Sequence, residues 1–315
     1  MAKRRMKRYA RRTTRAGKSS RMPVVLLCVV IFLILSVSVS VVIGILLGRK
    51  ANEVEQRPKF EFSKTEYESG GKSVRSVEAY YFAKGASAAD YYVQGIRDFS
   101  FCLRHEDGSL DHASVIASTL GFDITDEEYS VPRTVSRIHA EGGRACGYFY
   151  VTAFAEQNSG LRDVYLAYEL SLIEEMAESG IDEIVLMGIE VNESNIAAVE
   201  EFLARAAICA PDTAIGVRVS LDTLRLTDEE IYCAARMKNA CDFLALDLCH
   251  LTLDDARDGK TEDGTRVPSV LEEILEQNEY YISSYGLRLL FSREHSQIYK
   301  SAMELGVVDF QIVGK

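Results

Sequence analysis

Three acidic side chains lie where segments with strand character end, and two of them could act as a catalytic pair. Glu190, Asp247 and Glu294 each come at or just after the end of such a segment. Hydrolysis of a glycosidic bond needs two carboxyl groups flanking that bond, about 5–5.5 Å apart for retention and about 6.5–9.5 Å apart for inversion. We therefore expect Glu190 to be the acid/base, with Glu294 or Asp247 as its partner.

Other polar side chains end the same segments and would contact a substrate. The candidates for substrate binding are Arg104, Tyr150, Arg218 and His250. Arg218 and Asp247 lie at similar heights on consecutive segments, which predicts an ion pair between them. Each charged candidate also has a structural interpretation, as a solvated loop residue or as half of an interior ion pair. Both interpretations stay open at this stage.

Eight segments with strand character alternate with helical patterns from residue 76 onward. They span residues 77–83, 99–104, 145–151, 183–189, 214–220, 243–249, 287–292 and 308–313. Eight such units in about 240 residues predict a (β/α)₈ barrel of the TIM type, whose strand ends form one open face. A doubly wound open sheet is the alternative, but no glycine-rich phosphate-binding motif follows any strand. Since the chain stops after the eighth strand, we expect the last helix to be missing.

Alternation along each strand predicts which side chains face the barrel interior. On the fourth strand the predicted inward residues are Leu186, Gly188 and Glu190, which turns Val185 and Met187 outward. Polar or charged inward positions on the other strands are Ser100, Cys102, Arg104, Arg218, Asp247, Arg288, Ser292, Asp309 and Gln311. Buried charges are costly unless paired, so we expect these residues to pair or to lie near the open end.

The first 75 residues have the organisation of a membrane anchor. Residues 24–48 contain no charged side chain, and about 20 apolar residues suffice to cross a bilayer as a helix. Residues 1–23 hold ten Lys and Arg and no acid, so the N-terminus is expected in the cytoplasm and residues 76–315 outside it. Residues 49–75 form a polar spacer. A cleaved signal peptide is the alternative, but its apolar region would be only ~7–15 residues long.

Charge and composition exclude several functions. The 292 residues after the basic tail carry 26 basic and 47 acidic side chains, which excludes a nucleic-acid partner because phosphate contacts need clustered cations. The five histidines show no metal-binding spacing, so we expect no metal and no cofactor. The expected partners are membrane lipid, through residues 24–48, and a glycan. The oligomeric state is left open, and six cysteines outside the apolar run are expected to be buried thiols.

Three stretches carry a resemblance to a known family: residues 77–82, residues 138–152 and the segment Gly180-Ile-Asp-Glu-Ile-Val-Leu-Met187. Over residues 76–250 the chain resembles a group of glycoside-hydrolase-like TIM barrels found on bacterial cell surfaces. The resemblance implies a barrel acting on a cell-envelope or scavenged glycan. That family has Asp and then Arg-Phe-Pro after its fourth strand, where this chain has Met187-Gly-Ile-Glu190-Val-Asn192.

The departure after the fourth strand leaves Glu190 as the nearest acid. In many retaining barrel glycosidases the fourth and seventh strands supply the two carboxyl groups, which corresponds to Glu190 and Glu294 here. The alternative is a non-catalytic barrel that binds a glycan or an envelope protein.

Overall fold

The computed structural model describes residues 75–78, 96–120, 130–156 and 158–314. The chain divides into two compact units, residues 1–56 with 262–265, and residues 57–261 with 266–315. The second unit contains the elements discussed below. The expected membrane span at residues 24–48 and most of the spacer lie outside the described ranges. Within those ranges, no helix is both long and apolar enough to cross a bilayer.

Eight parallel strands close into a barrel, which confirms the predicted fold class. In the order of their pairing around the barrel they are β1 (Arg75–Glu78), β10 (Phe310–Val313), β9 (Leu287–Ser292), β6 (Phe243–Asp247), β5 (Ala214–Val219), β4 (Glu183–Met187), β3 (Ala145–Tyr150) and β2 (Asp98–Arg104). The first and last strands close the ring, with Ser76 opposite Gln311. All strand ends that carry the candidate residues therefore lie on one face.

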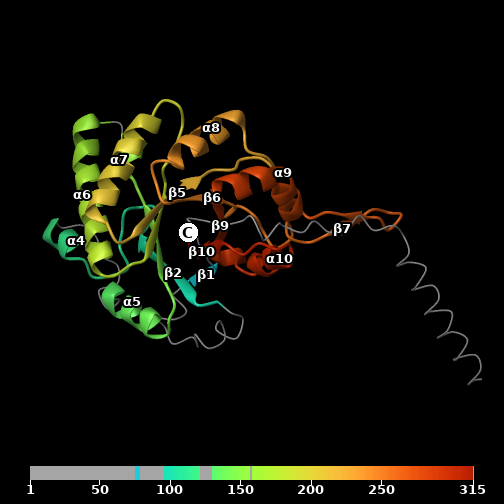
Figure 1. Cartoon of the computed structure of the whole chain (residues 1–315), viewed down its shortest axis with the longest axis horizontal. Coiled ribbons are helices and arrows are strands. Elements are labelled where there is room, and N and C mark those ends of the chain that lie inside the picture. The colour runs from blue at the N-terminus through green and yellow to red at the C-terminus, as the bar shows by residue number, and fades with distance from the viewer. Residues whose placement is uncertain (1–74, 79–95, 121–129, 157, 315) are drawn as a thin grey trace, which may run out of the picture. The chain divides into compact units, whose positions relative to one another are not determined.

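Helices surround the strands (Figure 1). They are α4 (Val115–Leu120), α5 (Val131–Ala140), α6 (Ser159–Glu178), α7 (Ile196–Cys209), α8 (Asp228–Met237), α9 (Val270–Tyr285) and α10 (Ile298–Glu304). Local chemistry sets several of their ends: Thr227 and Glu230 form a capping box at the start of α8, and Gly286 ends α9 in the left-handed conformation. In the described ranges β10 is the last element, so no helix follows the eighth strand.

Three short elements extend the connections. Two are single 3₁₀ turns, η1 (Ala153–Ala155) after β3 and η2 (Arg293–His295) after β9. The third is a two-stranded antiparallel hairpin of β7 (Gly259–Lys260) and β8 (Arg266–Val267) between β6 and α9. The sequence did not predict this hairpin, because two-residue strands are too short to show an alternating pattern.

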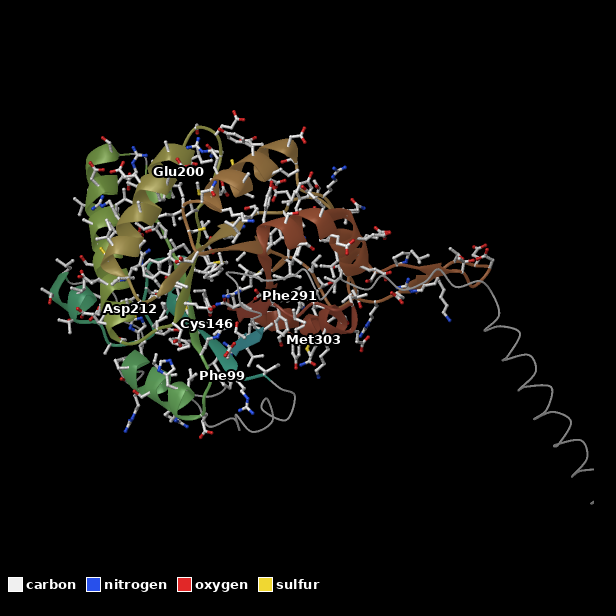
Figure 2. The ribbon with its side chains drawn as sticks, in the orientation of Figure 1. Phe99, Cys146, Glu200, Asp212, Phe291 and Met303 are labelled. Carbon is white, nitrogen blue, oxygen red and sulfur yellow. The ribbon has the colours of Figure 1, made fainter. Side chains whose placement is uncertain are left out.

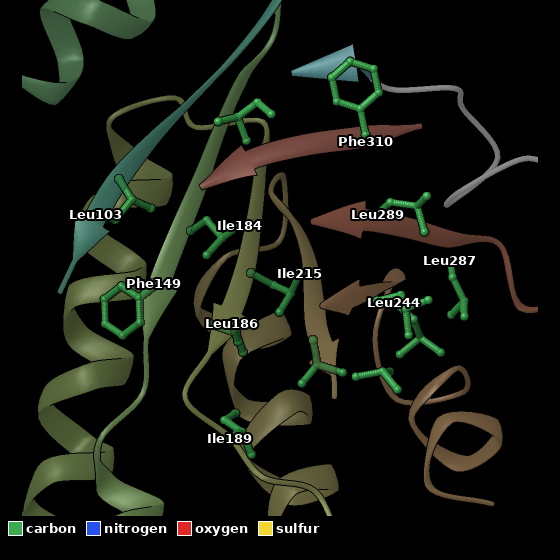
Figure 3. Close-up of a cluster of buried hydrophobic side chains, with 14 of the residues drawn as sticks. Leu103, Phe149, Ile184, Leu186, Ile189, Ile215, Leu244, Leu287, Leu289 and Phe310 are labelled. Atoms are coloured by element: carbon green, nitrogen blue, oxygen red, sulfur yellow. The ribbon is translucent and has the colours of Figure 1, made fainter. Parts of the chain in front are cut away.

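An aliphatic layer fills the space between the strands and the helices. Figure 3 shows this layer, with Phe149 and Leu186 projecting from their strands towards the helices. The interior of the barrel contains a second cluster, which includes Tyr148, Val185 and Met187. The predicted orientation of β4 was therefore wrong: Val185 and Met187 point inward, and Leu186 points outward. Every residue of β4 after its first is apolar, so alternation could not fix the orientation of this strand.

Charged side chains close the amino-terminal end of the barrel, as the prediction of paired interior charges required. Arg288 is 1% exposed, and its Nε and Nη2 lie 3.0 Å and 2.6 Å from Asp309 and Glu183. Arg144 contacts the other Glu183 oxygen at 2.6 Å and also pairs with Asp98. We call these five residues the floor network. In Figure 2 the nearby Cys146 lies among the strands, inside the ring of helices.

An aromatic ring covers the floor network from above. The guanidinium of Arg288 lies 4.1 Å from the centre of the Phe243 ring. That ring occupies the space over Gly216, where a Cβ atom would come within 2.2 Å of it. Glycine at position 216 is thus required by the close approach of Phe243. The ring belongs to the interior cluster that also contains Tyr148, Val185 and Met187.

Candidate functional site

An ion pair marks the centre of the barrel mouth. Arg218, near the end of β5, places its Nε 2.6 Å from Oδ2 of Asp247, the last residue of β6. The other Asp247 oxygen accepts a hydrogen bond of 2.8 Å from the backbone N–H of Cys249. Arg218 is 24% exposed and Asp247 13%. The predicted pairing is confirmed, and it fixes Asp247 as a carboxylate that already has two partners.

Tyr150 lies beside this ion pair, at the end of β3. Its half-buried ring packs against the interior cluster that contains Cys102 and Cys249. Burial raises the pKa of Tyr150, and nearby negative groups, among them Glu106 and Asp247, raise it further. The phenol therefore stays neutral at physiological pH and can donate a hydrogen bond. The structure thus brings together Tyr150, Arg218 and Asp247 among the predicted site residues.

A cavity of about 370 Å³ opens beside Arg218, between the carboxyl ends of β4 and β5 and helix α8. We call it the first mouth cavity. Its polar lining residues are Glu190, Asn192, Arg218, Ser220, Asp222, Thr227, Glu229 and Glu230, and its apolar wall includes Val191, Val219 and Met237. Ligand sites in proteins commonly measure about 300–1,000 Å³, so this cavity has room for a small ligand.

Glu190 lines the first mouth cavity, but its backbone differs from the prediction. Gly188 follows β4 with a φ of 74°, and a Cβ there would lie 2.9 Å from the carbonyl oxygen of Val151. The strand therefore ends before Glu190, and Gly188 makes a turn instead of opening space inside the barrel. Glu190 is exposed, and its carbonyl oxygen accepts a hydrogen bond of 2.7 Å from Asn195. Its side chain enters the cavity from a loop.

Glu294 and His250 also lie at the mouth, but neither is among the residues that line the first mouth cavity. Glu294 is exposed on the 3₁₀ turn η2, where its backbone N–H donates to the hydroxyl of Ser292. His250 is exposed after β6 and helps to lower the pKa of Asp255, behind the larger effect of hydrogen bonds from Thr252. Of the two predicted carboxyl groups, Glu190 therefore lines the first mouth cavity and Glu294 does not.

Arg104 does not face the barrel interior, and that prediction was wrong. A register shift between Cys102 and Arg104 turns the end of β2, so the side chain passes outward to helix α6. There its Nη1 lies 2.7 Å from Glu169, and its two terminal nitrogens donate to the carbonyl of Tyr150 and the hydroxyl of Thr152. A bulge reverses the facing of later residues in a strand, and alternation in the sequence cannot reveal it.

The sequence analysis missed the partner of Arg104. Glu169 is fully buried and also accepts hydrogen bonds from the backbone and side chain of Thr152. Burial raises the pKa of Glu169, against the opposing effect of Arg104. One signal was present: Glu169 lies on the buried stripe of α6, one turn before Ile173. An acid on such a stripe indicates an interior pair. Leu161 and Val164, near the start of the same helix, are exposed.

A second mouth cavity, of about 470 Å³, lies above Arg104 between the loops that follow β2 and β3. Its lining residues are Arg104, Glu106, Asp107, Gly108, Ser109, Thr152, Ala155, Glu156 and Tyr165. Glu106 was not predicted as a site residue, although its effect on the pKa of Tyr150 places it near the mouth. Both cavities are lined by residues that follow the carboxyl ends of barrel strands, the second after β2 and β3 and the first after β4 and β5, so they open at the same end of the barrel.

The described residues contain no cluster of three or more His, Cys, Asp or Glu side chains arranged to hold a metal ion. The six cysteines in the described ranges are free thiols, four of them buried. Burial raises the pKa of Cys241 to about 12, which leaves that thiol unreactive. His112 is fully buried between two backbone carbonyls, so its role is structural.

No protein-family model matches the chain, and no curated protein matches it. Solved structures do share its fold. A candidate α-L-fucosidase from Bacteroides thetaiotaomicron VPI-5482 aligns with a TM-score of 0.51 at 8% identity, over 83% of this chain and 89% of that one. A second candidate α-L-fucosidase from Bacteroides thetaiotaomicron has a TM-score of 0.43 at 12% identity, over 81% and 59%.

The tryptophan synthase A-subunit of Pyrococcus furiosus aligns with a TM-score of 0.45 at 11% identity, over 79% of this chain and 88% of that one. The chain spans about three fifths of the length of one candidate fucosidase. At these identities the likeness is one of fold. It supports an eight-stranded barrel distantly like those of glycoside hydrolases, and the chemistry of the mouth must be argued from this chain's own residues.

Proposed function

We propose that the barrel binds a carbohydrate at its mouth, with one sugar ring in the first mouth cavity. The observation that carries this proposal is the cavity itself, which places Arg218, Asn192, Ser220 and four carboxylates around about 370 Å³. Sugar hydroxyls donate and accept, so they need this mixture of acceptors and donors. The ion pair with Asp247 holds the Arg218 guanidinium in place for such a contact.

Binding is favoured over hydrolysis because the carboxyl groups are not placed as a pair. Glu190 lines the cavity, whereas Asp247 and Glu294 are not among its lining residues. Hydrolysis also requires one carboxyl group that is protonated near neutral pH, and Glu190 is exposed to solvent.

Hydrolysis is the second candidate, and one observation favours it. Asp247 is half-buried at the end of β6 and contacts the Arg218 guanidinium, as a nucleophile or a charge-stabilising group could do. In that case Glu190 would supply the proton and Asp247 or Glu294 the second carboxyl group. The predicted roles of Arg104, Tyr150 and His250 in substrate binding stay part of the proposal. Arg104 lines the second mouth cavity, Tyr150 lies at the end of β3 beside the ion pair, and His250 is exposed in the loop after β6.

The proposal includes the location of the barrel. The apolar run at residues 24–48 would anchor the chain in the cell membrane, with the basic tail in the cytoplasm and the barrel outside. Protease added to intact cells should then digest the barrel and leave the tail. Replacement of the arginines between Arg4 and Arg15 should weaken this orientation. A barrel that stays protected in intact wild-type cells contradicts the proposed location.

The test of binding uses the full-length protein in detergent micelles and a panel of neutral, anionic and amino-bearing glycans. At least one glycan should bind, and Asp222→Asn should weaken that binding about tenfold or more, because hydrogen bonds to charged groups contribute about 1.5–3 kcal/mol. The matched control is Asp228→Asn, an exposed acid on the first turn of α8 that does not line the cavity. The absence of binding to every glycan contradicts the proposal.

Aryl glycosides and the bound glycan should be assayed for cleavage in the same preparation. No turnover is expected from a binding barrel. If turnover is found and Glu190→Gln lowers it by ~10²–10⁴-fold, the effect expected when a general acid is lost, hydrolysis replaces binding as the function.

A further inference from the structure

The two mouth cavities share an unusual balance of charge. Each has one arginine among its lining residues, and in each case a carboxylate already neutralises that arginine. Arg218 pairs with Asp247 at 2.6 Å, and Arg104 pairs with Glu169 at 2.7 Å. Neither guanidinium therefore offers a net positive charge to a ligand.

The remaining charged groups that line the cavities are all acidic. They are Glu190, Asp222, Glu229 and Glu230 in the first cavity and Glu106, Asp107 and Glu156 in the second. Several accept local hydrogen bonds: Asp107 from Ser109, Glu156 from the backbone of Asn158, and Glu230 from the backbone of Thr227. The bonds from Ser109 lower the pKa of Asp107. Among the described residues, no basic side chain other than the paired arginines lines either cavity.

The Arg104–Glu169 pair at the second cavity is buried but incompletely hydrogen-bonded. Arg104 is 3% exposed and Glu169 fully buried, yet Nε of Arg104 and Oε2 of Glu169 lack hydrogen-bond partners among the described residues. A buried polar atom without a partner costs about 1–3 kcal/mol. Such atoms in native proteins call for an explanation, of which a functional role is one.

The excess of acidic side chains in the two cavities disfavours some ligands and favours others. Clefts lined by charges of one sign concentrate ligands of the opposite sign. Uronic acids, sulfated sugars and phosphorylated sugars would bring like charges together, which costs several kcal/mol in a desolvated interface.

We propose that the ligand of the two mouth cavities is an oligosaccharide that carries free amino groups, such as a chain of unacetylated amino sugars. This inference rests on the proposed carbohydrate-binding function. Protonated amines on successive rings would contact the acids of the first and second cavities. The ring hydroxyls would contact Arg218, Asn192 and Ser220.

The test compares three β-1,4-linked oligomers of equal length that differ only at carbon 2 of each ring: glucosamine, N-acetylglucosamine and glucose. Binding of each to the full-length protein in detergent micelles is measured calorimetrically at low and high salt. The glucosamine oligomer should bind about tenfold or more tightly than the other two, and its advantage should shrink as salt screens the charges.

Variants locate the effect. Glu190→Gln in the first cavity and Glu106→Gln in the second should each lower the preference for glucosamine, and both residues are exposed. Glu201→Gln, at an exposed acid of α7 that lines neither cavity, is the matched control and should change nothing. The comparison of the three oligomers needs only the wild-type chain, so it is decisive even if a variant folds poorly.

Each other outcome has a defined meaning. Equal or tighter binding of the acetylated or glucose oligomer overturns the amino-sugar inference and leaves the carbohydrate-binding function standing. A lysine oligomer that competes as strongly as the glucosamine oligomer shows recognition of charge alone and also overturns the inference. Binding of an anionic glycan does the same. If no glycan of any class binds, the proposed function itself is wrong.

Discussion

The two ends of the barrel use the same residue types in opposite ways. At the floor, Arg288 is 1% exposed and contacts Asp309 and Glu183 under the Phe243 ring. At the mouth, Arg218 is 24% exposed and contacts Asp247, with a cavity beside it. Arginine–carboxylate pairing by itself therefore does not identify a functional site. The two ends differ in exposure: the arginine at the mouth keeps part of its surface accessible to a ligand, and the arginine at the floor does not.

The largest expected effect comes from breaking the floor. Arg288→Met leaves Asp309 and Glu183 as buried carboxylates without their shared cation, so the free energy of unfolding should fall by about 3–5 kcal/mol. Denaturant titration of the full-length chain in micelles measures the loss. The double variant with Asp309→Asn should recover part of it. A loss below about 1 kcal/mol would mean that the floor network does not hold this end of the barrel together.

The same kind of change at the mouth should cost less, because water can solvate the partner that remains. Asp247→Ala is expected to lower the free energy of unfolding by about 1–3 kcal/mol. In a cycle with Arg218→Met the pair should show a coupling energy of about 0.5–3 kcal/mol. Strictly additive losses would contradict a direct interaction between Arg218 and Asp247.

The buried pair of Arg104 and Glu169 should make the free energy of unfolding depend on pH. Because burial raises the pKa of Glu169 above that of the unfolded chain, the folded state binds its proton more tightly. This contribution to stability is present at acidic pH and is lost as the pH rises through the raised pKa. The difference in unfolding free energy between the wild type and Glu169→Gln should therefore change over that range. A difference that is constant with pH contradicts the raised pKa.

The smallest effect on stability is expected at the rim. Glu190→Gln removes one exposed charge, and surface substitutions usually change the free energy of unfolding by no more than about 0.5 kcal/mol. Glycan binding should nevertheless weaken in this variant. A large loss of stability would show that Glu190 has a structural role, and unchanged binding would remove it from the site.

Much of the fold was predictable because period-two alternation is strong where one strand face is polar. The inward placement of Arg218, Asp247, Arg288, Asp309 and Gln311 was correctly predicted for that reason. The prediction failed at β4, whose apolar residues gave no contrast, and at Arg104, where a bulge shifts the register. Both failures concern backbone geometry that the identity of single residues does not record.

The candidate site was less predictable than the fold. The ends of the strands were found, but the cavities depend on the conformation of the loops after the strands and on the way helices α6 and α8 pack beside them, which periodicity does not specify. Glu106 and Glu169 were missed because one lies in a loop without a pattern and the other in a helix. The catalytic roles of Glu190, Glu294 and Asp247 stay predictions, and those roles require the binding and turnover measurements above.

The Phe243 ring lies against both Gly216 and the Arg288 guanidinium, which ties these three positions together. A side chain at position 216 would displace the ring, so natural variation there should be limited to glycine unless position 243 changes with it. The exposed acids Glu190 and Glu106, by contrast, can be exchanged at little cost in stability. Ligand preference at the mouth can therefore diverge faster than the packing at the floor.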